Sequence, residues 1–238
     1  MKGMGTIINV IFIVFGGLIG NLFGNKLPER YQDTIMKANG VAVLFIGISG
    51  AMSQMLTIHD MALETQGTMM MTVSLSLVAV IGEMLRLDYR LEQFGEWLKR
   101  KTENAKEASF VDGFVTATMT VCIGAMAVIG SIQDGIYGDY SILLAKAILD
   151  FVIILIMSAS LGKGCIFSAI PVGLFQGIIT LSAGFLTPVI TDAAMAYLSL
   201  VGSILIFCVG VNLLWDIKIK VTNLLPALII AMVWSYIS

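Results

Sequence analysis

The sequence predicts an all-α integral membrane protein, a polytopic bundle of about eight transmembrane helices arranged as repeated helical hairpins. Of its 238 residues, 58% are hydrophobic and 13% are charged, whereas soluble domains average about 45–50% and about 25%. The apolar residues gather in runs that approach the roughly 20 residues needed to cross a bilayer. A third observation is that the basic residues fall in alternate loops.

The predicted spans follow from the apolar runs in chain order. The first run is interpreted as a retained span and not a cleaved signal peptide, because no small-residue cleavage site follows Ile7–Phe15. The second and last runs are short, so each either spans with little tilt or inserts only partly. The eight runs cover about 5–24, 41–57, 69–87, 111–132, 141–161, 165–186, 193–215 and 222–237.

The loops sort by charge. Nearly all Lys and Arg residues follow the first, third, fifth and seventh spans, and the opposite loops 58–68, 133–140 and 187–192 contain none. By the positive-inside rule the basic loops are cytoplasmic, which places both termini outside. The longest basic loop also predicts an amphipathic cytoplasmic helix over about 88–106, because Leu91, Phe94 and Leu98 recur at helical spacing.

Short similarities predict internal repeats within a single transmembrane domain, 1–238. Gly17–Asn21 resembles Ala79–Glu83, and Lys163, Ser168 and Pro171 have the spacing of Lys218, Asn223 and Pro226. These matches favour four parallel hairpins; chance similarity between glycine-rich apolar helices is the alternative. The possible repeats are 5–57, 69–132, 141–186 and 193–237.

Two ionisable residues inside the fifth span are candidates for a translocation site. Lys146 and Asp150 are one helical turn apart, so they share a face and can pair. Charged groups within a span are costly and often mark a transport pathway. The alternatives are a structural ion pair, or a Lys146 side chain that snorkels to the outer surface.

Three polar residues at the cytoplasmic ends of spans form a second candidate group. Each lies one or two residues after a glycine at the cytoplasmic end of its span; the three are Asn21, Glu83 and Asn212. Side chains at the same depth can form a polar ring at the cytoplasmic opening of a cavity. For Glu83 the alternative is an interfacial salt bridge with Arg86 or Arg90.

The sixth span carries a polar seam. Ser168, Gln176 and Thr180 lie near one face, and Pro171 between them predicts a kink. Transporters often bind substrate at broken helices, so Gln176, near mid-membrane, is the candidate for direct substrate contact. The alternative is an interhelical hydrogen bond.

The remaining polar residues carry weak signals. Asp134, Asp139 and Asp192 are expected in solvated outer loops. His59 with Asp60 and Glu64 lacks the ligand set of a metal site, so we expect no metal and no cofactor. Catalytic and nucleic-acid motifs are absent from the sequence, which disfavours an enzyme.

Several motifs resemble a known family. Gly16–Asn21, Ile81–Glu83, Phe167–Val172 and Asn223–Ala227 are similar to those of a bacterial inner-membrane protein family of unknown function, the YdfK/YqgA-like family. The resemblance covers essentially the whole chain. It implies a multi-pass protein of the bacterial plasma membrane with a possible role in transport, and it supplies no substrate or site residues.

Together these observations predict a membrane transporter or channel for a small solute or ion. The alternative is a non-transporting scaffold or regulatory protein that acts through its cytoplasmic amphipathic helix. A bundle of eight short helices has little interior volume, so we expect a homodimer or higher homo-oligomer in the lipid bilayer.

Overall fold

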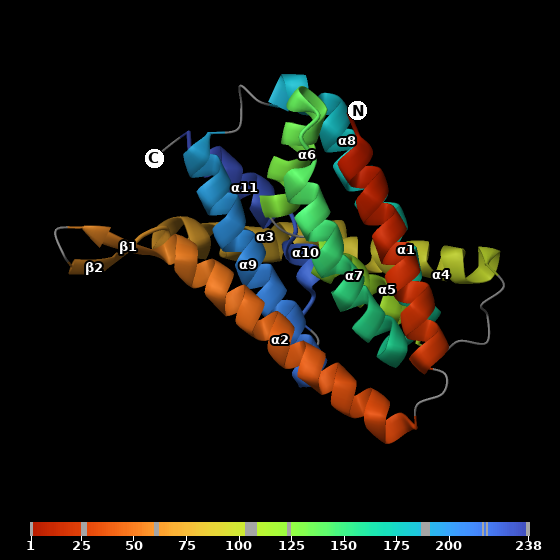
Figure 1. Cartoon of the computed structure of the whole chain (residues 1–238). Helices are drawn as coiled ribbons and strands as arrows, with labels where there is room; N and C mark the ends of the chain where they lie inside the picture. Colours follow the sequence, from red (N-terminus) through yellow and green to blue (C-terminus); the bar gives the residue numbers. More distant parts are fainter. Residues whose placement is uncertain are drawn as a thin grey trace. The chain divides into compact units, whose positions relative to one another are not determined.

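The computed structural model describes residues 2–24, 28–59, 62–102, 109–122, 125–186, 191–215, 217 and 219–236. Several charged loop residues of the topology argument, namely Lys26, Asp60, Lys106 and Lys218, lie outside these ranges. The described chain is almost entirely helical (Figure 1). Its helices are α1 (Met4–Gly24), α2 (Glu29–Met55), α3 (Thr68–Leu85), α4 (Leu87–Lys101), α5 (Phe110–Cys122), α6 (Ala125–Tyr137), α7 (Ser141–Leu161), η1 (Lys163–Ser168), α8 (Ala169–Leu186), α9 (Asp192–Leu214), α10 (Val221–Leu224) and α11 (Ala227–Trp234).

The all-α polytopic membrane bundle is confirmed. Six described helices are long and apolar enough to cross a membrane, and α5 with α6, bent by 63°, can form a seventh span. The predicted eighth span is the shorter apolar segment Val221–Trp234, broken between α10 and α11. At 1.5 Å per residue this segment reaches only about 21 Å, less than the roughly 30 Å hydrocarbon core.

Some element boundaries differ from prediction. Helix α2 begins at Glu29 and not near residue 41, because the polar stretch before the apolar run is helical and continuous with it. The predicted outer loop contains a short antiparallel hairpin of β1 (Leu56–His59) and β2 (Ala62–Thr65), with Leu56 opposite Thr65. The predicted amphipathic helix is α4, and its Leu98 packs with Phe110 and Phe114.

The chain divides into two compact units that are interleaved along the sequence. Unit 1 comprises 1–39, 91–122 and 126–188, and unit 2 comprises 40–90, 123–125 and 189–238. The helices of the first predicted hairpin, α1 and most of α2, therefore belong to different units. The four sequence repeats remain a prediction.

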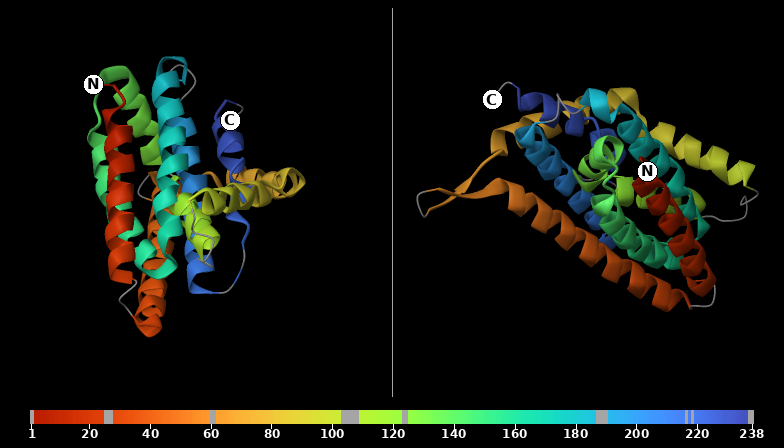
Figure 2. Two further views of the ribbon diagram at one scale, coloured as in Figure 1. Left: turned by 90° about the vertical axis from the view of Figure 1, so that its right-hand side faces the viewer. Right: turned by 45° about the horizontal axis from the view of Figure 1, so that its top comes forward.

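In unit 1, a column of glycines joins α1 to α7. Gly16, Gly20 and Gly24 recur every four residues and face the main-chain oxygens of Phe151, Leu155 and Ala159, so the two helices run parallel. A Cβ at Gly20 would lie 2.1 Å from the Leu155 oxygen. Small residues permit such close backbone approach in membrane helices. Two views show α1 beside α7 along most of its length (Figures 1 and 2).

The sixth span starts irregularly, but not through a proline kink. Lys163–Ser168 forms the 3-10 segment η1, in which Gly164 meets the Phe110 main-chain oxygen. Pro171 lies in the first turn of α8, where a missing backbone N–H leaves no helical hydrogen bond unmade. The kink predicted at Pro171 is therefore wrong, and the break lies before it.

In unit 2, α2 and α9 pack through glycines in opposite directions. Gly47 of α2 meets the Phe207 backbone, and Gly210 of α9 meets the Leu44 backbone. Helices α3, α9 and α11 share an apolar core that includes Val78, Val201 and Ala227. Gly82, near the end of α3, abuts the Asn223 backbone.

We predict that Gly20→Ala destabilises the protein by about 1–3 kcal/mol or more, because the added methyl collides with backbone that cannot move aside. The matched control is Gly177→Ala on α8, where a Cβ has no neighbour within 4 Å. Thermal unfolding in detergent measures both variants. A Gly20→Ala protein as stable as the control would contradict the α1–α7 contact.

Candidate functional site

A buried ion pair lies inside α7 of unit 1. The Lys146 Nζ donates to the Asp150 Oδ2 at 2.5 Å, with side-chain exposures of 8% and 5%. The same Nζ donates to the Val121 carbonyl at 2.7 Å. Val121 lies in the last turn of α5, where carbonyls lack intrahelical partners. The Lys146 side chain thus points inward and does not snorkel, and the predicted pairing of Lys146 with Asp150 is present; whether the pair has a structural or a transport role stays a prediction.

Two amides extend this pair across three helices. Asn9 on α1 is fully buried, and its Nδ2 donates to the Gln176 Oε1 of α8 at 3.4 Å. The Asn9 side chain also lies beside the Asp150 carboxylate. We call Asn9, Lys146, Asp150 and Gln176 the buried network. Sequence reasoning missed Asn9, although an amide within an apolar span is the signal that identified Gln176.

Polar atoms of the network and its neighbours lack partners in the described part of the chain. These atoms are the Asn9 Oδ1, the Gln176 Nε2, and the Oγ1 atoms of Thr6 and Thr180. An unsatisfied buried polar group costs about 1–3 kcal/mol. Buried polar atoms of Thr118, Ser131 and Asn223 also lack partners, but the four named first share α1 and α8, which favours polar contents over apolar packing between these two helices.

A cavity of about 550 Å³ opens beside these groups in unit 1. Its wall is built by α1, α6 and α8, and includes Lys2, Thr6, Ile7, Gly177, Thr180 and Leu181. Asn9 lies three residues along α1 from Thr6, and Gln176 lies four residues along α8 from Thr180. The two threonines therefore belong to the cavity wall, with their hydroxyl oxygens buried, and the two amides lie about one helical turn from them along each helix.

Asp134 anchors α1 beside this cavity. It is fully buried, and its carboxylate oxygens accept hydrogen bonds from Gly3 N at 3.1 Å and Gly5 N at 2.9 Å. The first N–H groups of a helix lack helical partners and favour a negative charge. A solvated loop position for Asp134 was wrong because α6 continues to Tyr137.

Asp139 does lie in an exposed loop. It accepts hydrogen bonds from the Ser141 hydroxyl and backbone N–H at the start of α7. These bonds to Ser141 hold the pKa of the Asp139 carboxyl below its usual value.

Two other predicted site residues make local structural contacts. Ser168 donates to the Cys165 carbonyl at 2.7 Å. The Asn212 amide bonds both the N–H and the carbonyl of Ile219, at 2.9 and 2.8 Å. These contacts hold a 3-10 turn and a loop, and they give no sign of a ligand.

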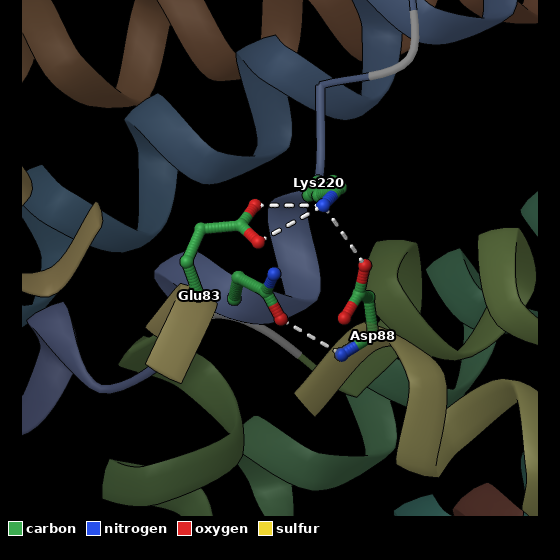
Figure 3. Close-up of polar contacts among 4 residues, drawn as sticks. Glu83, Asp88 and Lys220 are labelled. Carbon is green, nitrogen blue, oxygen red and sulfur yellow. Dashed lines mark hydrogen bonds and ion pairs between the residues drawn. The ribbon is translucent and has the colours of Figure 1, made fainter. Parts of the chain in front are cut away.

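Glu83 pairs with Lys220 and not with the predicted arginines. The Lys220 Nζ lies 2.8 Å from the Glu83 Oε1 and 3.6 Å from the Asp88 Oδ2, between the two carboxylates (Figure 3). Hydrogen bonding to Glu83 raises the pKa of Lys220. The Asn223 Oδ1 accepts from Asp88 N at 2.8 Å, so this exposed cluster fastens the α3–α4 junction to the start of α10.

Asn21 lies apart from this cluster, in unit 1. It lines a smaller cavity of about 190 Å³ with Gln32, Ser109 and Ser158. The predicted ring of Asn21, Glu83 and Asn212 involves both units and stays a prediction.

Apolar spans, bent helices and a buried polar network define a polytopic helical membrane protein with a polar site among its helices. A family model described as "Protein of unknown function (DUF554)" matches residues 4–236. The chain therefore belongs to this family, and the resemblance predicted from its motifs is confirmed.

Two curated relatives match almost end to end. The "Uncharacterized membrane protein YdfK" of Bacillus subtilis (strain 168) is 29% identical over 226 residues, 95% of this chain and 93% of the relative. The "Uncharacterized protein YqgA" of Escherichia coli (strain K12) is 28% identical over 233 residues, 96% and 94% of the two chains. No solved structure matches.

We predict that the two charges of the network depend on each other. Lys146→Met or Asp150→Leu alone leaves an uncompensated buried charge and is expected to cost about 3–5 kcal/mol. The double variant removes both charges and is expected to recover most of that loss. Unfolding of the two single variants and the double variant in detergent measures the coupling, and additive losses would show that the pair is not coupled.

Proposed function

We propose that this protein is a transporter or channel for a small solute or ion, with the path through unit 1. The observation that carries the proposal is the continuity of polar groups from the cavity to the centre of the unit. Thr6 and Thr180 line the cavity, and the buried network follows them. Ionisable groups within a span typically mark such pathways.

An apolar layer supports this assignment as a closed gate. Ile13, Ile154 and Val172 are each four residues from a network residue on the same helix, and all three are fully buried in one cluster. Because a hydrophobic constriction excludes water, it can stop conduction. The cavity thus lies about one helical turn from the network on one side, and the apolar cluster adjoins the network on the other side along these helices.

The test measures the entry of small solutes and ions into proteoliposomes that contain the purified protein. We expect Gln176→Leu to abolish flux, because it removes an amide from the path while leaving the helix intact. Asp150→Asn is expected to abolish flux as well. The double variant of Lys146→Met and Asp150→Leu is expected to fold, so a loss of flux in this variant reflects the missing carboxylate and not unfolding. Retained flux in Gln176→Leu would contradict the path.

The matched control is Ser160→Ala on α7. The Ser160 hydroxyl bonds the Ile156 carbonyl of its own helix; Ser160 lies in the wall of the smaller cavity and belongs neither to the wall of the larger cavity nor to the network. Its flux is expected to equal that of the unchanged protein.

A scaffold function is the second candidate, and one observation favours it. The inner face of α4 is covered, but Trp97 is 50% exposed and basic residues fill the last turn. An exposed Trp beside cations suits a protein partner or a lipid headgroup. If Trp97→Ala with Arg100→Ala abolishes a cellular phenotype while the transport variants do not, the scaffold function is favoured.

We also propose that the protein lies in the bacterial plasma membrane as a homodimer or larger assembly, without enzymatic activity. In this proposal the basic loops are cytoplasmic and both termini are outside, which requires the short segment Val221–Trp234 to cross a locally thinned bilayer. The charge distribution among the loops supports this topology.

The topology is tested by fusing after Ser238 a reporter whose activity differs between the periplasm and the cytoplasm. Activity from outside the cytoplasm is expected. As a control, the same reporter is fused within the basic loop after α4, where a cytoplasmic signal is expected. A cytoplasmic signal from the terminal fusion would exclude the eight-span topology.

A further inference from the structure

We propose that the cavity and buried network of unit 1 bind a small neutral solute that both donates and accepts hydrogen bonds, of the urea, amide or polyol class, and not an ion. This inference rests on the proposed transport function and narrows its substrate class.

The orientation of the two amides follows from chemistry. The Asn9 side chain lies beside the Asp150 carboxylate, and the NH₂ group is the end of an amide that can donate to a carboxylate oxygen. The same NH₂ group then donates to the Gln176 Oε1. This order leaves one free acceptor, the Asn9 Oδ1, and one free donor, the Gln176 Nε2.

The threonines add two groups of the same neutral kind. Thr6 and Thr180 belong to the cavity wall and are each 8% exposed, and their hydroxyl oxygens are buried just behind its surface with no partner among the described residues. Each hydroxyl can both donate and accept. The four unpartnered groups therefore match a solute that carries donors and acceptors close together.

The charges of the site are already neutralised. The Lys146 Nζ is bound by Asp150 and by the Val121 carbonyl, and Asp150 is bound by Lys146 and lies beside Asn9. A bare ion entering a dry interior needs a compensating charge. Of the residues lining the described cavity, Lys2 is charged, and it is exposed. An ion would therefore find no free counter-charge at the amides.

The size of the cavity agrees with this class. Its volume of about 550 Å³ lies within the usual range of roughly 300–1,000 Å³ for small-molecule sites. At Gly177 and Gly184 in its wall, the space that a Cβ would take has no neighbour within 4 Å. A small neutral solute can therefore enter the cavity without displacing side chains, and small movements of Thr6 and Thr180 would then bring it to the polar groups behind the wall.

The experiment compares neutral solutes with ions in the same proteoliposomes. Light scattering follows swelling driven by urea, acetamide or glycerol, and ion-sensitive dyes follow potassium and chloride entry. We expect the protein to raise the entry of at least one neutral solute more than tenfold over protein-free liposomes, with no increase for either ion.

Site variants test the residues. Thr6→Val with Thr180→Val removes two unpartnered hydroxyls, so folding is expected to survive while neutral-solute entry falls at least tenfold. Gly177→Trp is expected to block entry by filling the cavity. Ser160→Ala should leave entry unchanged.

Three results would count against the proposal in different ways. Ion entry that depends on Gln176, without neutral-solute entry, would overturn the substrate class and leave the transport function standing. Neutral-solute entry that is unaffected by the threonine and Gly177 variants would overturn the assigned site. Entry of neither class in folded protein would overturn the transport function and this inference together.

Discussion

The contact between α1 and α7 is the constraint on which unit 1 depends. Three glycines bring the α1 backbone against α7 main-chain oxygens, and the Ser158 hydroxyl adds a bond to the Gly17 carbonyl at 2.8 Å. This contact fixes the height of α1 along α7, so Asn9 can reach the Asp150 carboxylate. Asp134 restrains the same helix at its first turn. The position of the polar site is thus set by backbone packing and not by the polar groups themselves.

Polar and apolar groups alternate along the helices of unit 1. Thr6 at the cavity, Asn9 in the network and Ile13 in the apolar cluster follow one another along α1. Leaving the hydroxyls and amides incompletely bonded costs stability. A fold selected for stability alone would fill these positions with apolar side chains. The retained polar atoms are therefore better explained by contents that complete their hydrogen bonds.

Much of the fold could be predicted because span length and hydropathy are local properties of the chain. The span 141–161 coincides with α7, and the Lys146–Asp150 pair follows from spacing on a single helix. Partners on different helices could not be predicted. The Glu83–Lys220 pair joins residues 137 apart in sequence, and the Asn9–Gln176 bond joins residues 167 apart. Spacing along the chain reveals only near neighbours, so it favours Arg86 and Arg90 as partners of Glu83 and cannot identify Lys220.

The interleaving of the two units has a consequence for biosynthesis. Helix α1 ends at Gly24, but its partner α7 ends at Leu161. At roughly 5–20 residues per second, the ribosome needs about 7–27 s to supply the residues between these points. During this interval α1 enters the bilayer with Asn9 and its glycine column exposed to lipid or to the insertion machinery. Unit 1 therefore closes only after most of the chain has been synthesised, and an insertase or chaperone that shelters α1 would act on this helix before the rest of the unit is complete.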